Sequence, residues 1–139
     1  MSSYYRGAHA VILVYDVTNR NSFAHIEQRW LDQVELYCTR GAEHCVLMLL
    51  GNKVDLVSDG KESNRAVPVE EAMALAQSKG MIFAECSSKM NIGLSDAMTS
   101  LADQLLTVAA QAGLENTNTG MRLTDYSNTE DASQGACGC

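Results

Sequence analysis

Residues 45–55 read CVLMLLGNKVD, an unbroken apolar run that gives way at once to polar side chains. The apolar run, Cys45 to Leu50, is too short for a buried helix and predicts a strand that is buried on both faces. Strands of this kind belong to parallel sheets, in which ligands bind outside the carboxyl ends of the strands. The group that follows, residues 51–55, therefore lies where such a sheet would place a binding site.

Two other short apolar runs predict two further strands. Residues 10–15 read AVILVY and residues 81–84 read MIFA. The second of these runs leads into ECSSK at residues 85–89, another polar group at the end of a strand. Apolar residues recur at helical spacing in three stretches, which predict helices over residues 22–37, 68–79 and 94–108. The alternation of strands and helices predicts an α/β fold with three parallel strands and right-handed crossovers.

Local signals set the ends of these elements. Asn19 or Asn21 can cap the first helix, and Gly80 follows the second helix as a stop signal. Residues 56–67 are mostly polar and lack periodicity, so they predict a surface loop. The spacing on the last helix predicts one apolar face made of Leu94, Met98, Leu101, Leu105 and Val108.

Composition limits the class of protein. The chain has 139 residues, of which 46% are hydrophobic, enough for one ordinary core. Gly, Asn, Thr and Ser dominate after Gln111, so we expect a single domain over residues 1–110 and a disordered tail over residues 111–139. A net charge of −7 and ten scattered basic residues argue against nucleic acid as a partner. No apolar run reaches the roughly 18 residues that a membrane span requires.

The cysteines fall into two groups. Cys38, Cys45 and Cys86 lie in apolar stretches and are expected to be small core residues. The total of five is odd, and the spacings do not suggest a disulfide framework, so we expect a reducing, cytoplasmic environment. Cys137 and Cys139 stand apart because they end the chain.

The two polar groups resemble, in order and spacing, the guanine-reading motifs of the Ras superfamily. Residues 52–55 (NKVD) match the pattern NKxD, and residues 85–89 (ECSSK) nearly match E-x-S-A-K. Residues 4–16 (YYRGAHAVILVYD) narrow the resemblance to the Rab small GTPases. It implies the C-terminal half of a P-loop small-GTPase fold and the function of a Rab-like GTP-binding protein in vesicle-mediated, intracellular protein transport.

The resemblance implies a guanine-binding set made of Asn52, Lys53, Asp55, Ser87, Ser88 and Lys89. The Asp55 carboxylate would accept the N1–H and the exocyclic amine of guanine together, a pair of donors that adenine does not offer. Asn52 would contact N7 and brace the second loop, and the alkyl stem of Lys53 would lie along the base plane.

The second loop carries the other members of this set. By the resemblance, the backbone N–H of Ser88 would meet the O6 atom of guanine. Most family members have alanine there, and we expect serine to be tolerated with a small loss because the backbone makes the contact. Ser87 and Lys89 would support Asp55 and the base.

The ending Cys137-Gly138-Cys139 resembles the CxC ending on which Rab proteins receive two geranylgeranyl groups. One lipid chain anchors a protein weakly, whereas two anchor it stably. The resemblance implies lipidation of both cysteines, a position in the cytoplasm or on the cytoplasmic face of intracellular membranes, and three partners: Rab escort, geranylgeranyl transferase and GDP-dissociation-inhibitor type proteins. A chance cysteine-rich end or a metal-binding dithiol is the alternative.

Several family motifs do not occur in the sequence. There is no GxxxxGK[ST] phosphate-binding motif, and none of the ten glycines has an aspartate three residues before it, as the DxxG motif requires. Residues 1–110 are therefore interpreted as a partial small-GTPase domain without P-loop, switch I, DxxG, catalytic residues or metal ligands. We expect base contacts to GTP or GDP, whereas the Mg²⁺ that the family uses lacks its ligands here.

Three hypotheses remain. The first is a Rab-like trafficking protein in a truncated or alternative form, which is not expected to hydrolyse GTP by itself. The second is a non-catalytic, prenylatable interaction module, or decoy, for Rab escort and prenylation partners. The third is an incomplete gene model of an active enzyme, which an endogenous protein larger than 15.1 kDa with an upstream GxxxxGK[ST] motif would favour.

Overall fold

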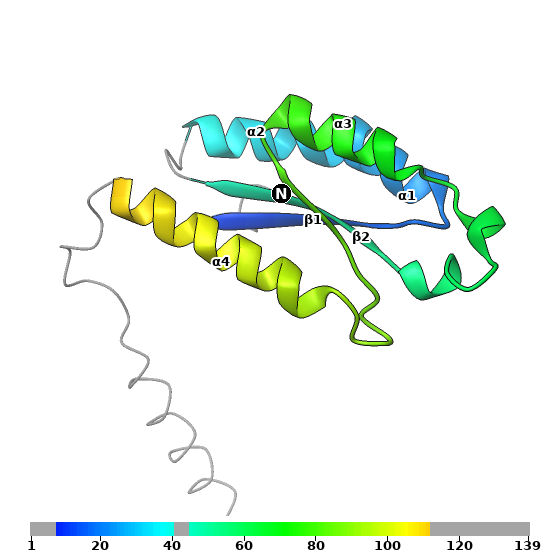
Figure 1. The fold of residues 1–139 in the computed structure, drawn as a ribbon. Helices are drawn as coiled ribbons and strands as arrows, with labels where there is room; N and C mark the ends of the chain where they lie inside the picture. Colours follow the sequence, from blue (N-terminus) through cyan, green and yellow to red (C-terminus); the bar gives the residue numbers. More distant parts are fainter. Residues whose placement is uncertain (1–7, 41–44, 112–139) are drawn as a thin grey trace, which may run out of the picture.

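The computed structural model describes residues 8–40 and 45–111 of the chain. In chain order its main elements are β1 (Ala10–Asp16), α1 (Arg20–His25), a π-helix (Ile26–Trp30), α2 (Leu31–Arg40), β2 (Val46–Asn52), α3 (Val69–Lys79), β3 (Ile82–Glu85) and α4 (Leu94–Gln111) (Figure 1). The tail predicted after Gln111, with Cys137 and Cys139, lies outside the described residues. The side chain of Cys38 is not described either, so its predicted burial stays a prediction.

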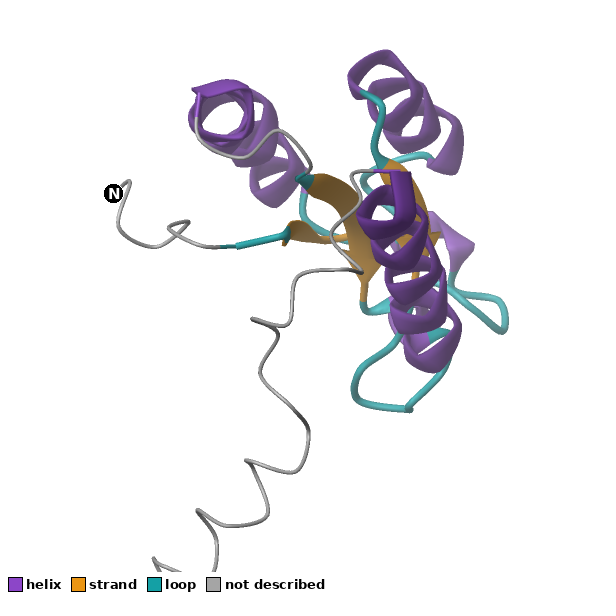
Figure 2. Ribbon diagram, turned by 90° about the vertical axis from the view of Figure 1, so that its left-hand side faces the viewer, coloured by secondary structure: helices purple, strands orange, loops and turns teal. Residues whose placement is uncertain are grey.

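The three strands form a parallel sheet in the order β1-β2-β3, which confirms the predicted α/β class. The register pairs Ala10 with Val46 and Asp16 with Asn52, and it pairs Gly51 with Glu85. Helices α1, α2 and α3 cover one face of the sheet and α4 covers the other (Figures 1 and 2). All three strands therefore end at the same edge of one layered domain.

Apolar side chains from the two faces of the sheet form two core clusters. Beneath α1, α2 and α3, the Phe23 side chain is fully buried and meets the Tyr15 ring edge-on, with ring centroids 5.1 Å apart. Beneath α4, Met48 and Leu50 of β2 pack with Leu101. Because successive side chains of a strand point to opposite faces, one apolar strand serves both clusters.

The first predicted helix is present without a break in the chain, but it consists of two α-helical parts and a π-helical part between them. It begins at the Asn19 cap, whose Oδ1 accepts a hydrogen bond from the Ser22 N–H at 3.2 Å. A π-helical stretch, Ile26–Trp30, then separates α1 from α2. The apolar spacing that predicted the helix does not mark this widened turn.

Other details differ from the predictions. Strand β3 begins at Ile82, because the N–H of Met81 donates to the carbonyl of Ala76 and closes the end of α3. On α4, Ala97 is buried where Met98 was expected, and Met98 is 37% exposed. The connector over residues 56–67 includes part of a short 3-10 turn at Val54–Leu56 and a second one at Glu62–Asn64. Cys86 is buried as predicted, whereas Cys45 is partly exposed.

The β1 strand is at the edge of the sheet in the part of the chain that the structure describes. Its Val14 side chain is 52% exposed. None of the described helices combines the length and the apolar character that crossing a membrane would take.

Candidate functional site

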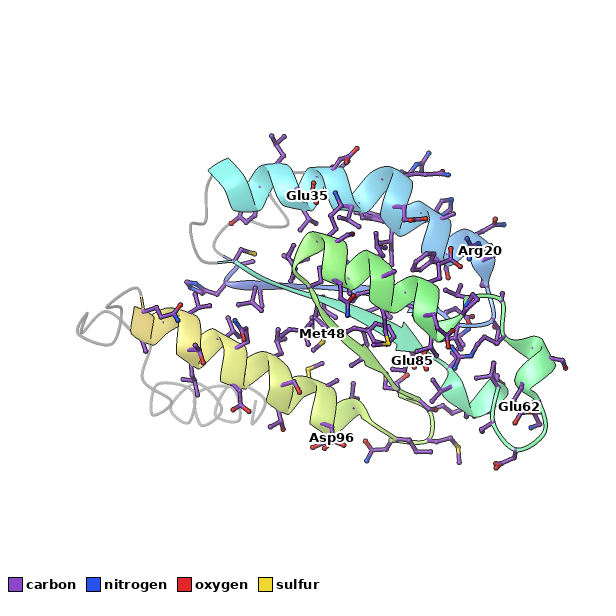
Figure 3. The ribbon with its side chains drawn as sticks, turned by 45° about the horizontal axis from the view of Figure 1, so that its top comes forward. Arg20, Glu35, Met48, Glu62, Glu85 and Asp96 are labelled. Carbon is purple, nitrogen blue, oxygen red and sulfur yellow. The ribbon has the colours of Figure 1, made fainter. Side chains whose placement is uncertain are left out.

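Polar side chains gather where the three strands end. Asp16 ends β1, residues 52–55 follow in and after β2, and residues 85–89 follow in and after β3. Figure 3 labels Glu85, the last residue of β3. The sheet register places Asp16 beside Asn52 and Gly51 beside Glu85. The two loops predicted from sequence are thus neighbours, and a third strand adds an acidic residue to them.

The Asn52 side chain ties the two loops together. Its Oδ1 accepts hydrogen bonds from the Lys53 N–H at 2.8 Å and from the Ser88 N–H at 3.0 Å. Its Nδ2 donates to the Ser88 hydroxyl at 3.0 Å. The Cys86 thiol approaches the same Oδ1 at 3.7 Å. Burial, followed by the Glu85 carboxylate, raises the pKa of this thiol, so the sulfur keeps the proton that it donates.

The Asp55 carboxylate is held by the second loop as well. Ser87 is fully buried, and its hydroxyl donates to Asp55 Oδ1 at 2.7 Å while accepting from the Met90 N–H at 3.1 Å. The backbone groups of Ser87 and Ile92 exchange hydrogen bonds of 2.9 and 3.0 Å, which closes the loop on itself. A charge-assisted bond of this length fixes the direction in which the carboxylate faces.

Lys53 takes an unusual backbone conformation, with φ 70° and ψ 34°. Its ammonium group lies 2.9 Å from Asp16 Oδ2, and Asp16 Oδ1 accepts from the N–H and the hydroxyl of Thr18 at 2.9 and 2.7 Å. Sequence reasoning missed Asp16, although its position at the end of the first predicted strand was a usable signal. The aspartate directs the lysine side chain along the carboxyl edge of the sheet.

The environment of Asp16 has opposing effects on its pKa. Partial burial raises the pKa, but the hydrogen bonds from the Thr18 side chain and from Lys53 outweigh burial and hold the pKa below its ordinary value. A carboxyl group with a lowered folded-state pKa adds stability above its unfolded-state pKa, and this stability disappears as the pH falls through the folded-state value.

We expect Lys53→Met to raise the pKa of Asp16 toward its ordinary value, because the substitution removes the ammonium group that favours the carboxylate. The pKa is measured by following the Asp16 carboxyl carbon by NMR between about pH 2 and pH 6. Lys79→Met is the matched control, since Lys79 pairs with Glu35 and does not contact Asp16. An unchanged Asp16 pKa in Lys53→Met would contradict the proposed contact.

A second ion pair braces the connector. The two terminal nitrogens of the Arg65 guanidinium, Nη1 and Nη2, donate to the Glu85 carboxylate at 2.7 and 3.0 Å. Nη1 also donates to the carbonyl of Val67 at 3.2 Å. The hydrogen bonds to Glu85 raise the pKa of Arg65 above its ordinary value. Sequence reasoning treated this segment as a plain surface loop and did not find the pair. Through this ion pair, Arg65 holds the connector against the end of β3.

The remaining features of the site are open to solvent. Lys89 is exposed in the second loop and makes no ion pair with the residues that the structure describes. A groove of about 500 Å³ runs beside Asp55, between Val54 and the side chains of Met90 and Ile92. Across residues 8–40 and 45–111, no three His, Cys, Asp or Glu side chains come together as a metal site.

Residues 1–107 match the model of the Ras family. The chain is 40% identical over 136 residues to the Ras-related protein Rab-18-B of Danio rerio, an alignment that covers 98% of the chain and 60% of that protein. It is 41% identical over 105 residues to the Ras-related protein RABC1 of Arabidopsis thaliana, covering 76% of the chain and 46% of that protein. The chain therefore spans about half of the length of the curated relatives it matches.

Proposed function

Because the chain belongs to the Ras family and, within it, to the Rab small GTPases, we propose that it is a guanine-nucleotide-binding protein of vesicle traffic. The observation that carries this proposal is the cross-bracing of two loops: Asn52 holds Ser88, and Ser87 holds Asp55. The carboxylate and the carboxamide are thereby oriented before any ligand arrives. Preorganised polar groups lose less entropy on binding.

We expect the described site to bind the nucleotide weakly, because it contacts only the base. Two charge-assisted hydrogen bonds contribute about 1.5–3 kcal/mol each, and the stem and charge of Lys53 against the base add about 1 kcal/mol. Association costs at least about 4 kcal/mol. We expect a dissociation constant in the millimolar range or weaker for the 139-residue chain.

The proposal does not include hydrolysis by these 139 residues. Phosphoryl transfer depends on a phosphate-binding lysine, a bound Mg²⁺ and a residue that orients water. The sequence motifs that carry those groups in the family do not occur among these 139 residues. We therefore assign no step to Mg²⁺.

Membrane attachment is the second part of the proposal. The ending Cys137-Gly138-Cys139 supports double geranylgeranylation, which would hold the protein on the cytoplasmic face of intracellular membranes. Rab escort, geranylgeranyl transferase and GDP-dissociation-inhibitor type proteins are the proposed partners. If the chain is prenylated in cells while an Asp55→Ala variant is prenylated equally well, the interaction module or decoy becomes the better account.

The direct test is a titration of the 139-residue chain with GDP, followed by backbone amide NMR. We expect shifts in residues 52–55 and 87–89 at millimolar GDP, at least a tenfold loss in Asp55→Ala, and no matching response to ADP. Asp59→Ala is the matched control, because it removes an exposed acidic residue of the neighbouring loop. The absence of GDP binding, or equal responses to GDP and ADP, would refute base recognition.

A further inference from the structure

The groove of about 500 Å³ beside Asp55 has an apolar rim that is open to solvent. Val54 and Val57 line the groove from the turn after β2, and Met90 and Ile92 line it from the loop after β3. Met90 is 57% exposed and Ile92 is 54% exposed. Removal of apolar surface from water is favourable, so an apolar segment that covers these two side chains would be stabilised there.

Charged side chains also line this groove. One of them, Arg65, is already paired with Glu85. Asp59 and Lys61 are exposed, and neither side chain makes a hydrogen bond or an ion pair with the residues that the structure describes. An occupant that suits the groove therefore combines apolar side chains with a basic group that can pair with Asp59.

One stretch of the chain after α4 has this composition. Residues 121–125 read MRLTD, so Arg122 stands between two large apolar residues, and no other lysine or arginine follows α4. The two apolar residues are two positions apart, and in an extended chain their side chains point to the same side. Arg122 and Asp125 carry charges of both signs, which complement Asp59 and Lys61.

The length of the chain allows this stretch to reach the groove. The α4 helix begins two residues after Ile92 and spans 18 residues, which is about 27 Å. Figure 1 shows α4 running back along the sheet from the loop after β3, so the chain leaves the helix at the far end from the groove. The residues from 112 to 121 extend at most about 33–36 Å, enough to return along α4. Leu114 is the large apolar residue nearest to the helix, and its reach of about 11 Å falls short.

We propose that residues 121–123 dock in the groove beside Asp55. The two apolar side chains of this docking segment cover the rim formed by Met90 and Ile92, and its guanidinium group pairs with Asp59. The chain after α4 then folds back along the helix and meets the domain next to the candidate site. This contact does not require a nucleotide, so its test does not depend on the proposed function.

Methyl NMR on the 139-residue chain, with labelled methionine, isoleucine and leucine methyl groups, tests the docking directly. We expect nuclear Overhauser contacts from the methyl groups of Met121 and Leu123 to those of Met90 and Ile92. The methyl shift of Met90 then reports the equilibrium constant for docking. Leu123→Ser should lower this constant at least about fivefold, because the variant loses an apolar side chain that the groove buries.

A second variant tests the ion pair. Asp59→Asn should lower the docking constant about two- to fivefold, the effect of one exposed pair of charges. Asparagine tolerates the positive φ of 55° at this residue, so the substitution removes the charge without straining the loop. An unchanged docking constant in Asp59→Asn would overturn the assigned pairing with Arg122.

Leu114→Ser is the matched control, because it makes the same substitution in the tail but outside the docking segment. It should leave the docking constant unchanged, and matching amide spectra over β1, β2 and α4 establish that each variant keeps the fold. The absence of the methyl contacts would overturn the proposal, as would an equal loss in Leu114→Ser and Leu123→Ser. Contacts between labelled and unlabelled chains in a mixed sample would place a second copy in the groove and would also overturn it.

Discussion

A Phe23→Ala variant is expected to lose about 3–5 kcal/mol of unfolding free energy. Phe23 is fully buried, and its ring meets Tyr15 at a centroid distance of 5.1 Å and an interplanar angle of 70°. The guanidinium carbon of Arg20 lies over the Phe23 ring, 5.6 Å from its centroid. Alanine would leave a cavity between α1 and β1 that the surrounding strands cannot fill, because packed cores relax only in part.

Urea unfolding of the 139-residue chain, followed by circular dichroism at fixed protein concentration, measures this loss. Phe23→Leu keeps most of the volume and should cost much less than Phe23→Ala. Leu106→Ala serves as the surface control, because Leu106 is 66% exposed and its removal should change stability by less than about 0.5 kcal/mol. A Phe23→Ala cost as small as that of Leu106→Ala would mean that this cluster does not hold the helices to the sheet.

The parts of the fold that could be predicted are those that depend on local pattern. The run at residues 45–50 is apolar throughout, so its strand and its burial follow from composition alone. Periodicity predicted α4 but put Met98 in the core instead of Ala97, because neighbouring positions on a helix are separated by 100° and a wide apolar stripe tolerates either. The π-helix has no such pattern and was missed.

The site shows the same division. The positions of Asn52 and Asp55 follow from a short motif at a strand end. The contact between Asp16 and Lys53 depends instead on which residues the register brings side by side, and a single strand does not specify its register. The pairing of Arg65 with Glu85 joins residues 20 positions apart, so no local pattern could reveal it.

Register also explains why glycine precedes the NKVD sequence at residues 52–55, because it pairs Gly51 with Tyr15. A Cβ atom at Gly51 would lie 2.8 Å from the Tyr15 hydroxyl oxygen, 2.9 Å from Tyr15 Cζ and 3.0 Å from Val17 Cγ1. Tyr15 is itself buried, so the ring has little freedom to move away. Gly51 allows the end of β2 to lie close to the Tyr15 ring, which supports the strand immediately before Asn52.

Gly51→Ala is expected to destabilise the chain by about 1–3 kcal/mol, the usual cost of overpacking a core. Tyr15→Phe should be neutral or stabilising, since the Tyr15 hydroxyl is buried and has no hydrogen-bond partner among the residues described. The double variant should then lose less unfolding free energy than the sum of the losses in the two single variants, because phenylalanine lacks the hydroxyl oxygen that is the nearest clashing atom. Urea unfolding of all four proteins gives this coupling free energy. Strict additivity would show that the clash with the hydroxyl is not the source of the cost, and a stabilised Gly51→Ala would show that the close approach does not exist.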